Sequence, residues 1–224
     1  MLGLVGFAYC CDMGLVSSRA PPPQEFGDVR VQEVSGAEAM STRTTLGAGC
    51  YWGTEKHVQN FGKEGGVVTR TAVGFMGPEG CKANPSYREV CSGRTGHVEV
   101  LDADFSDPKG VGRDVVYERL LRHFFMFHDP TTTNRQGNDV GTQYASVIFV
   151  HDSEQRRIAE KVKSELQELV SCGKVRYSGK TVTTAIAGAT TFYPAHRAHQ
   201  DYLNKNPGGY CNHYMRFKKW PSSS

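Results

Sequence analysis

The chain has 224 residues, of which 38% are hydrophobic and 22% are charged, enough for one domain with a real core. Its 26 basic and 23 acidic residues leave a net charge of +3, which is too weak to indicate a nucleic-acid partner. No run of about 20 apolar residues is present, so we expect no membrane span. Seven cysteines without framework spacing favour free thiols in a reducing compartment.

Residues 1–40 differ in composition from the rest of the chain and are expected to form a flexible leader. They combine a short apolar run at 2–8 with three consecutive prolines at 21–23. The apolar run lacks the basic segment of a secretory signal, and an organelle presequence would carry more arginine than Arg19 and Arg30. The predicted location is therefore the cytoplasm, with a mitochondrion or plastid as the alternative if the leader acts as a presequence.

From residue 41 onwards, segments with strand and helix patterns alternate. Runs rich in β-branched residues predict strands, and apolar residues at helical spacing predict helices. The expected elements are, in chain order, a strand at 44–49, a helix at 55–61, strands at 67–73 and 97–105, a helix at 113–128, a strand at 144–151, a helix from 152 onwards, a strand at 180–187 and a short helix at 193–203. This order predicts one α/β sandwich with split βαβ connections at 41–203, followed by a mobile tail at 204–224.

The two longest expected helices have well-defined inner faces. In the first, the apolar stripe consists of Tyr117, Leu120, Leu121, Phe124 and Phe125. In the second, Gln155 completes a capping-box pattern with Asp152. The inner face of this second helix consists of Ile158, Val162, Leu166, Leu169 and Val170.

Cys50 stands between an expected strand that ends in glycines and an expected helix. A thiol on the first turn of a helix meets the positive end of the helix dipole and unpaired backbone N–H groups, and both favour the nucleophilic thiolate. The neighbouring rings of Tyr51 and Trp52 offer an apolar wall for a small substrate group. A buried structural role is the alternative for a lone cysteine, but strand, glycines, aromatic rings and helix together favour a nucleophile.

Glu99 lies in the expected strand at 97–105, where alternate residues share one face. That face also carries Leu101, Ala103 and Phe105, so Glu99 should point inward with them. An apolar site disfavours the charged form of a carboxyl, which would keep Glu99 protonated near neutrality and able to act as a general acid. The strand pattern leaves one alternative open, a buried salt bridge to one of three arginines: Arg70, Arg88 or Arg94.

Two segments rich in polar groups are further candidates for a site. The turn at 84–87 delivers the hydroxyl of Tyr87. The segment 128–144 is a long loop ahead of a strand, and loops of this length are unusual in a compact domain unless they are functional. Asp139 and Tyr144 are expected to reach out from this loop.

Cys211 ends a flexible, turn-prone stretch at 206–211. A mobile thiol suits a resolving role, in which it attacks an oxidised partner to form a disulfide. Spacing alone leaves a free surface cysteine as the alternative. His196 and His199 are three residues apart, but no CxxC motif accompanies them, so we expect core histidines or tyrosine partners and no metal site.

Several short motifs occur together along the chain: GCYWG at 49–53, NPSY at 84–87, VCSG at 90–93, TGHVEV at 95–100, HDPT at 128–131, RQGNDVGTQY at 135–144 and HQDYL at 199–203. No single motif is decisive. In this order they resemble the peptide-methionine (S)-S-oxide reductases, the A class of methionine sulfoxide reductases, over about residues 45–211. The resemblance implies an α/β (α+β) roll around a mixed central sheet, with no metal and no tightly bound cofactor.

The resemblance also implies a role for the candidate residues in the chemical step. Cys50 would attack the sulfur of methionine sulfoxide, free or in proteins, while Glu99 donates a proton to the sulfoxide oxygen. Tyr87 and Tyr144 would hydrogen-bond that oxygen and support the acid.

Substrate contacts and recycling follow from the same resemblance. Tyr51 and Trp52 would pack around the terminal methyl group and set the preference for the S epimer, and Asp139 would help to orient the polar backbone of the substrate. Release of methionine would leave a sulfenic acid on the nucleophile. Cys211 would convert this acid to a disulfide, and thioredoxin would restore both thiols. The expected assembly is a monomer.

This sequence departs from the family pattern at three places. Tyr51 stands where phenylalanine is usual and adds a hydroxyl at the mouth of the pocket. The stretch 74–83 breaks a common glycine pair and contains the extra thiol of Cys81. Many relatives have a second recycling cysteine beyond the position of Cys211, but residues 212–224 contain none. Recycling through Cys211 alone is therefore the hypothesis, with Cys81 as the rival.

Two other functions compete with this reading. A Cys-His acyl hydrolase would use Cys50 with His97 or His199 as the base, and it would convert esters or amides without a reductant. A catalytically silent module would bind oxidised proteins without converting them. The joint presence of a nucleophile, an acid and two tyrosines argues against the silent module.

Overall fold

The computed structural model describes residue 26, residues 40–65 and residues 67–222 of the chain, so most of the expected leader at 1–40 lies outside the described residues. A six-stranded sheet with the strand order β7-β6-β1-β3-β2-β8 forms the centre of the molecule. Its strands are β1 (Arg43–Ala48), β2 (Val68–Met76), β3 (Val98–Phe105), β6 (Ser146–Val150), β7 (Ala185–Gly188) and β8 (Tyr193–Pro194). Only β6 and β7 run parallel, so the sheet is mixed, as predicted.

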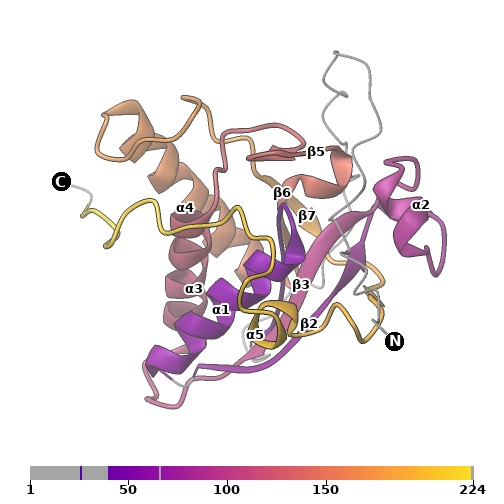
Figure 1. Cartoon of the computed structure of the whole chain (residues 1–224). Coiled ribbons are helices and arrows are strands. Elements are labelled where there is room, and N and C mark those ends of the chain that lie inside the picture. Colours follow the sequence, from indigo (N-terminus) through magenta and orange to yellow (C-terminus); the bar gives the residue numbers. More distant parts are fainter. Residues whose placement is uncertain (1–25, 27–39, 66, 223–224) are drawn as a thin grey trace.

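Three helices pack against one face of this sheet (Figure 1): α1 (Tyr51–Gly65), α3 (Arg113–Phe127) and α4 (Ser153–Ser171). All five residues of the apolar stripe predicted for α3 are buried. Four of the five predicted for α4 are buried, and Val170 is partly buried against the same core. Asp152 caps α4, because its Oδ1 accepts the N–H of Gln155 at 2.7 Å.

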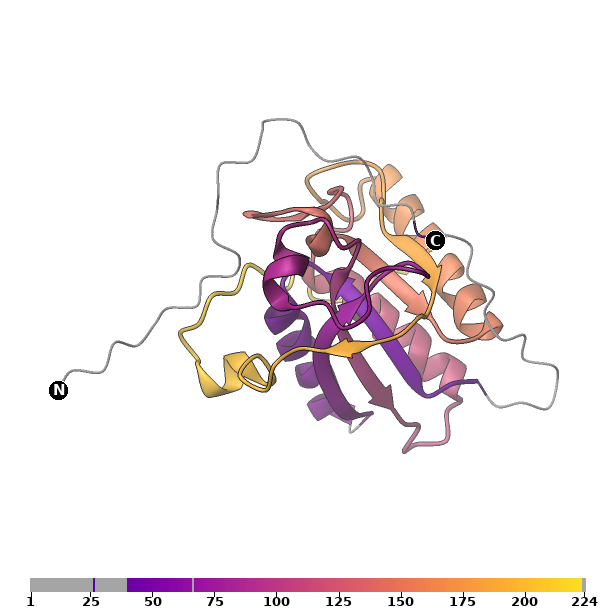
Figure 2. The ribbon, with the colours of Figure 1, turned by 90° about the vertical axis from the view of Figure 1, so that its right-hand side faces the viewer.

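The other face of the sheet has its own smaller apolar cluster, which consists of Met76, Val98, Val100, Ala145, Val147, Phe149 and Ala187. Because strand side chains alternate between faces, β3 sends Val98 and Val100 to this side, and it sends Glu99 and Leu101 to the helical side. In Figure 2 the strands lie in front of α1 and α3. Phe26 packs on this second face, with its ring edge-on to Phe149 and the centroids 5.4 Å apart.

The register of the central strands determines where the inward-facing polar residues lie. Leu46 of β1 is paired with Leu101 of β3, and Phe75 of β2 is paired with Glu99. Glu99 therefore lies near the same end of the sheet at which β1 ends and α1 begins. The strand pattern predicted this inward orientation of Glu99.

The long segment at 128–144 contains short elements of its own. It forms β4 (Arg135–Gln136) and β5 (Asp139–Val140), which pair as a hairpin, followed by the 3-10 helix η1 (Thr142–Tyr144). Asp139 and Tyr144 are both buried, so the expectation that they reach out from the loop is wrong. On the other side of the site, α2 (Tyr87–Cys91) begins at a capping box formed by Ser86 and Glu89.

Two predicted elements differ from the structure. The strand expected at 180–187 begins only at Ala185, because the N–H of Val182 donates to the side chain of Gln167 and that of Thr183 to Pro130. The helix expected at 193–203 is wrong, because Tyr193 and Pro194 pair with β2 as strand β8. Only α5 (Tyr202–Lys205) is helical in this region.

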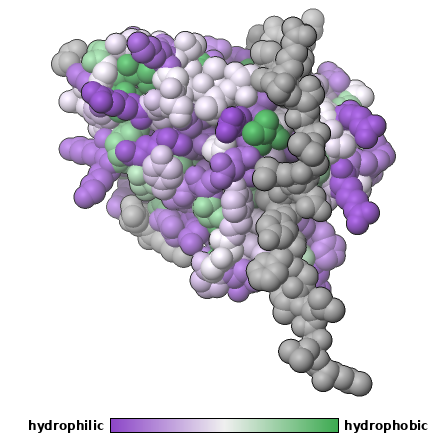
Figure 3. All heavy atoms as spheres, turned by 45° about the horizontal axis from the view of Figure 1, so that its top comes forward, coloured by the Kyte–Doolittle hydropathy of each residue, from purple (hydrophilic) through white to green (hydrophobic). Residues whose placement is uncertain are grey.

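Hydrophilic residues dominate the face shown in Figure 3, where hydrophobic residues occur only in small separate areas. Among the described residues, no helix is long and apolar enough to cross a membrane. Of the cysteines in the described ranges, four form no disulfide: Cys50, Cys81, Cys172 and Cys211. Cys91 is disulfide-bonded, so the expectation of free thiols is wrong at this position.

Candidate active site

Cys50 lies at the junction of β1 and α1, directly before the first helical residue. The turn depends on Gly49, whose φ of 89° is strained for any residue with a side chain. A Cβ on Gly49 would also lie only 2.4 Å from Cβ of Gln136. This glycine lets the strand pass closely under the β4–β5 hairpin and places the thiol at the positive end of the helix dipole. Cys50 itself is fully buried.

Glu99 reaches the same helix end from β3. Its Oε2 accepts the backbone N–H of Tyr51 at 3.1 Å, and the side chain is fully buried. Nucleophile and carboxyl therefore meet at one helix N-terminus, since Tyr51 directly follows Cys50. Arg70, one of the arginines considered as a salt-bridge partner, binds Asp102 and Asp104 instead.

An aromatic cluster surrounds the first turn of α1. The indole of Trp52 stacks on the ring of Tyr202 with centroids 3.8 Å apart, and on His199 with centroids 5.6 Å apart. His199 also lies 4.9 Å from the ring of Tyr87 and binds the hydroxyl of Tyr51 through Nδ1 at 2.9 Å. His199 thus joins three predicted site residues. It is the tyrosine partner that its spacing suggested.

The hydroxyl of Tyr51 does not lie at an open pocket mouth, as the sequence suggested. The whole residue is buried, and the hydroxyl is used in the bond to His199. Burial lowers the pKa of His199, so the ring is neutral at physiological pH. Tyr144 is buried in η1, which packs against the strand that carries Glu99. Tyr87 thus reaches the aromatic cluster beside His199, whereas Tyr144 belongs to a segment that packs on the strand of Glu99.

Asp139 binds the C-terminal tail. Its Oδ1 accepts the hydroxyl of Tyr210 at 3.0 Å, and its Oδ2 accepts the side-chain N–H of Asn212 at 2.8 Å. Burial raises the pKa of Asp139, while these two hydrogen bonds oppose the shift. The tail residues on either side of Cys211 are thereby attached to the β4–β5 hairpin.

This attachment brings Cys211 beside the first turn of α1. A Cβ built on Gly53 would lie 3.0 Å from Cys211 Sγ and 2.1 Å from His213 Nδ1. Gly53 is therefore what allows the tail to touch the helix one turn after Cys50. The tail crosses α1 near its N-terminal end and continues over α3 (Figure 1).

Cys81 occupies a different environment. Its Sγ lies 3.2 Å from Nε2 of His97, in the loop that follows β2. Burial raises the pKa of this thiol, which disfavours the nucleophilic form. Of the two rival resolving residues, the structure places only Cys211 beside the first turn of α1.

Glu55 is a positioning residue that the sequence reading did not single out. Its Oε1 accepts the hydroxyl of Thr71 at 3.0 Å, and its Oε2 accepts the N–H of Asp201 at 2.8 Å. Asp201 directly precedes the ring that stacks on Trp52, so Glu55 fixes this part of the aromatic wall. Its position four residues after Tyr51 puts it on the buried helix face, and that spacing was the available signal.

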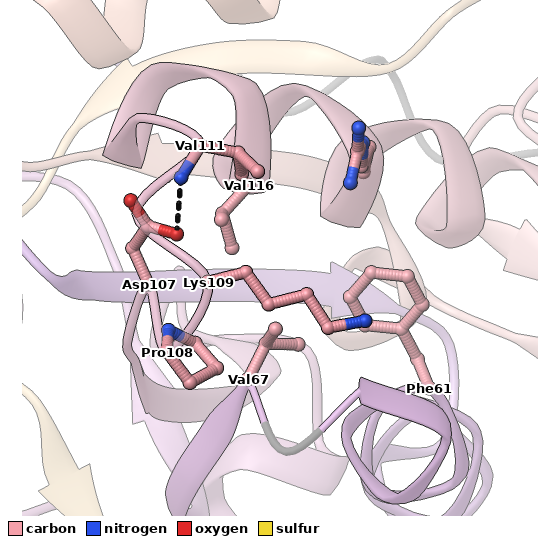
Figure 4. A pocket seen from close by; sticks show the side chains of 8 residues that line it. Phe61, Val67, Asp107, Pro108, Lys109, Val111 and Val116 are labelled. Carbon is pink, nitrogen blue, oxygen red and sulfur yellow. Dashed lines mark hydrogen bonds between the residues drawn. The ribbon is translucent and has the colours of Figure 1, made fainter.

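A cavity of about 240 Å³ lies away from these residues. It is lined by Phe61, Val67, Asp107, Pro108, Lys109, Val111, Val116 and Arg119. Figure 4 shows the side chain of Lys109 extending across it towards Phe61. Phe61 is roughly 15 Å along α1 from Tyr51, at ~1.5 Å per residue. This cavity is therefore separate from the thiol and the carboxyl.

Comparison with known proteins gives the family. The family model described as peptide methionine sulfoxide reductase matches residues 42–222. A peptide methionine sulfoxide reductase MsrA of Methanoculleus marisnigri is 49% identical over 78% of this chain and 96% of its own length. The probable peptide methionine sulfoxide reductase of Schizosaccharomyces pombe is 37% identical over 77% and 95%.

Solved structures agree with this comparison. The reduced form of Mxr1 from Saccharomyces cerevisiae has a TM-score of 0.67 and 34% identity, covering 87% of this chain and 99% of its own. Methionine sulfoxide reductase A of Corynebacterium diphtheriae has a TM-score of 0.56 and 32% identity, with 89% and 94% covered. The chain therefore belongs to the peptide methionine sulfoxide reductase family.

Proposed function

We propose that this protein reduces the S epimer of methionine sulfoxide, free or in proteins, to methionine, with thioredoxin as the final reductant. The observation that carries the proposal is the 3.1 Å bond between the N–H of Tyr51 and Oε2 of Glu99. This bond holds a carboxyl beside the residue that follows Cys50. A nucleophilic thiol and an acid at one buried helix end are what sulfoxide reduction requires.

In the chemical step, Cys50 Sγ attacks the sulfoxide sulfur while Glu99 protonates the departing oxygen. The substrate sulfur is reduced to the thioether, and oxygen passes to the cysteine as a sulfenic acid. Tyr87 and Tyr144 stabilise the charge that develops on this oxygen. The wall formed by Trp52 receives the methyl group and favours one epimer.

Asp139 is the proposed contact for the polar backbone of the substrate. Both of its carboxylate oxygens bind tail residues in the structure, Tyr210 and Asn212. Substrate and tail therefore compete for the same acceptor. Since Cys50 is fully buried, movement of the tail or the aromatic cluster would also open the way to the thiol.

Recycling uses Cys211. The sulfur of Cys211 attacks the sulfenic sulfur of Cys50, an S–S bond forms and the S–O bond breaks, and the proton of the Cys211 thiol joins the departing hydroxide to give water. The resulting disulfide is reduced by a dithiol protein, which becomes oxidised in exchange. Five large apolar side chains are exposed in the described part of the chain. Three of them lie within four residues of Cys211: Tyr210, Tyr214 and Met215. This apolar rim supports docking of a protein reductant such as thioredoxin.

A single turnover without reductant tests the reaction. Pre-reduced protein is mixed with the S or R epimer of methionine sulfoxide, and methionine formed and thiols lost are counted. We expect about one equivalent of methionine from the S epimer only, with loss of two thiols. No methionine from either epimer would overturn the proposal.

Two variants assign the roles of the central residues. Cys50→Ser should form no methionine, and Glu99→Gln should slow methionine formation by about 10²-fold or more, because general acids contribute that much. An unchanged rate in Glu99→Gln would remove the acid from the mechanism.

The acyl-hydrolase alternative is not supported. Both of its candidate bases are bound elsewhere, His97 to Cys81 and His199 to Tyr51. The protein belongs to a family of reductases. We therefore expect it to hydrolyse no ester or amide, whether or not a thiol reductant is present. We further propose a cytoplasmic monomer, which light scattering of the full chain and imaging of a tagged chain would test.

A further inference from the structure

His213 is a buried titratable residue that the steps above do not use. It lies two residues after Cys211, and the tail carries it into the core beside the end of β1. Its ring packs against Phe127 and faces His57, with centroids 5.7 and 6.3 Å apart.

Hydrogen bonding fixes the tautomer of this imidazole. Nε2 lies 2.6 Å from the carbonyl oxygen of Ala48. A carbonyl can only accept, so Nε2 carries the hydrogen and Nδ1 presents a lone pair. Nδ1 is buried and has no hydrogen-bond partner among the described residues. A buried acceptor left in this state is costly and calls for a functional reason.

The position of Nδ1 supplies that reason. Nδ1 and the thiol of Cys211 both lie against Gly53 of α1. A Cβ on Gly53 would be 2.1 Å from Nδ1 and 3.0 Å from Cys211 Sγ. The thiol is directed to the carbonyl oxygen of His213 at 3.7 Å, so it already contacts the residue that carries the ring. The same ring is anchored two residues before Cys50, through Ala48.

We propose that His213 is the proton acceptor for Cys211 when this thiol resolves the sulfenic acid of Cys50. This step rests on the proposed function. Nδ1 takes the thiol proton as the sulfur of Cys211 bonds to that of Cys50. The S–O bond breaks, and the same proton passes to the departing hydroxide, which leaves as water. The imidazole is neutral again at the end, and no other reactant is needed.

The groups around His213 keep it unprotonated. Burial lowers its pKa to about 4, and the nearby charges of His57 and Arg216 add to this shift, while the hydrogen bond to Ala48 opposes it. The pKa values of His57 and His128 are lowered by burial as well, so both rings are neutral near pH 7. Arg216 is the permanent charge among these groups, and it lies 3.6 Å from Asp129.

The first test compares His213→Gln with the parent in a single turnover with the S epimer. The glutamine amide lies where Nε2 does and can still donate to Ala48, but it offers no basic nitrogen. We expect methionine to form at about one equivalent, and loss of the second thiol to slow at least about tenfold. His123→Gln is the matched control, because this histidine also contacts a backbone carbonyl, that of His57 at 2.9 Å, and lies on α3.

The second test is the pH profile of second-thiol loss. With the general base in place, the rate should be flat between about pH 5 and 8. Without it, only the thiolate reacts, and the rate should rise about tenfold per pH unit across this range. A slope of this kind in the parent, or a parental rate in His213→Gln, would overturn the proposal. Added imidazole should restore the rate of His213→Ala.

These outcomes distinguish a failure of the proposed function from a failure of the role of His213 alone. If the parent forms no methionine, the proposed function fails and the role of His213 fails with it. If methionine forms and both His213 variants lose the second thiol at the parental rate, only the role of His213 fails. If His213→Gln does not fold, the parental pH profile still decides.

Discussion

The indole of Trp52 lies flat on the ring of Tyr202, with the planes 14° apart and the centroids 3.8 Å apart. Trp52 belongs to the first turn of α1, and Tyr202 begins α5 near the other end of the chain. Glu55 reinforces this contact by holding Asp201. The aromatic wall of the site is therefore built by two distant segments, and its rigidity depends on both.

Replacing Tyr202 with leucine should weaken substrate binding. An aromatic pair contributes about 1 kcal/mol beyond its buried area, so KM for the sulfoxide should rise about fivefold, with a smaller change in kcat. Tyr202→Phe keeps the stacked ring and should retain the parental KM. Equal KM values in the leucine and phenylalanine variants would show that the stack does not shape the site. Steady-state kinetics with a sulfoxide peptide supply the measurement.

A methyl group on Gly53 should displace the tail. The added Cβ would overlap His213 Nδ1 and crowd Cys211 Sγ, so the tail must move although alanine favours the helix by up to about 1 kcal/mol. We expect Gly53→Ala to form methionine in a single turnover but to lose its second thiol at least about tenfold more slowly.

The matched control for this change is Gly208→Ala. Gly208 is an exposed tail glycine, and a Cβ there meets no atom within 4 Å. It should lose both thiols at the parental rate. If both alanine variants resolve the sulfenic acid equally fast, close contact of the tail with α1 is not needed for the disulfide step.

Local patterns predicted most of the fold. The apolar stripes of α3 and α4 and the inward face of β3 follow from periodicities within single elements, and the structure confirms them. The end of the domain was less predictable. Tyr193 becomes a strand because it pairs with Phe75, and Val182 stays outside β7 because Gln167 takes its N–H. Such partners are distant in sequence, so no local pattern reveals them.

The site shows the same difference between local features, which the sequence predicts, and contacts between distant segments, which it does not. Cys50 and Glu99 could be found because a helix start and a strand face are local features. The attachment of Asp139 to the tail could not, since it depends on how the last residues fold back over the hairpin. His213 was missed for the same reason. Its only local signal is its closeness to Cys211, and its contact with Ala48 spans most of the chain.

The apolar rim around Cys211 should determine how well thioredoxin reduces the disulfide. Met215→Ser should raise KM for thioredoxin about fivefold, the equivalent of about 1 kcal/mol of lost apolar contact, and leave the single turnover unchanged. Val111→Ser is the control, because Val111 has the same exposed fraction of 41% as Met215 but precedes α3. Equal KM values for the two variants would place the docking surface elsewhere. A coupled assay with thioredoxin reductase supplies the measurement.

Buried histidines should make the fold sensitive to mild acid. Burial lowers the pKa of His128 to about 3, while a histidine in the unfolded chain titrates near ~6.5. The unfolded state therefore binds one more proton between these values. The stability contributed by the neutral ring is complete above pH ~6.5 and is lost as the pH falls towards 3, at up to about 1.4 kcal/mol per pH unit.

The test is urea unfolding at several pH values between 4.5 and 7. His151 and His213 titrate near 4 and add to the slope in the parent. His128→Asn should be less stable at pH 7, because the bond from Nε2 to Ser146 is lost. Its free energy of unfolding should nevertheless fall less steeply with acid, by about 1.4 kcal/mol per pH unit. His196→Asn, at an exposed position, should keep the parental slope, and equal slopes in all three proteins would contradict the assignment.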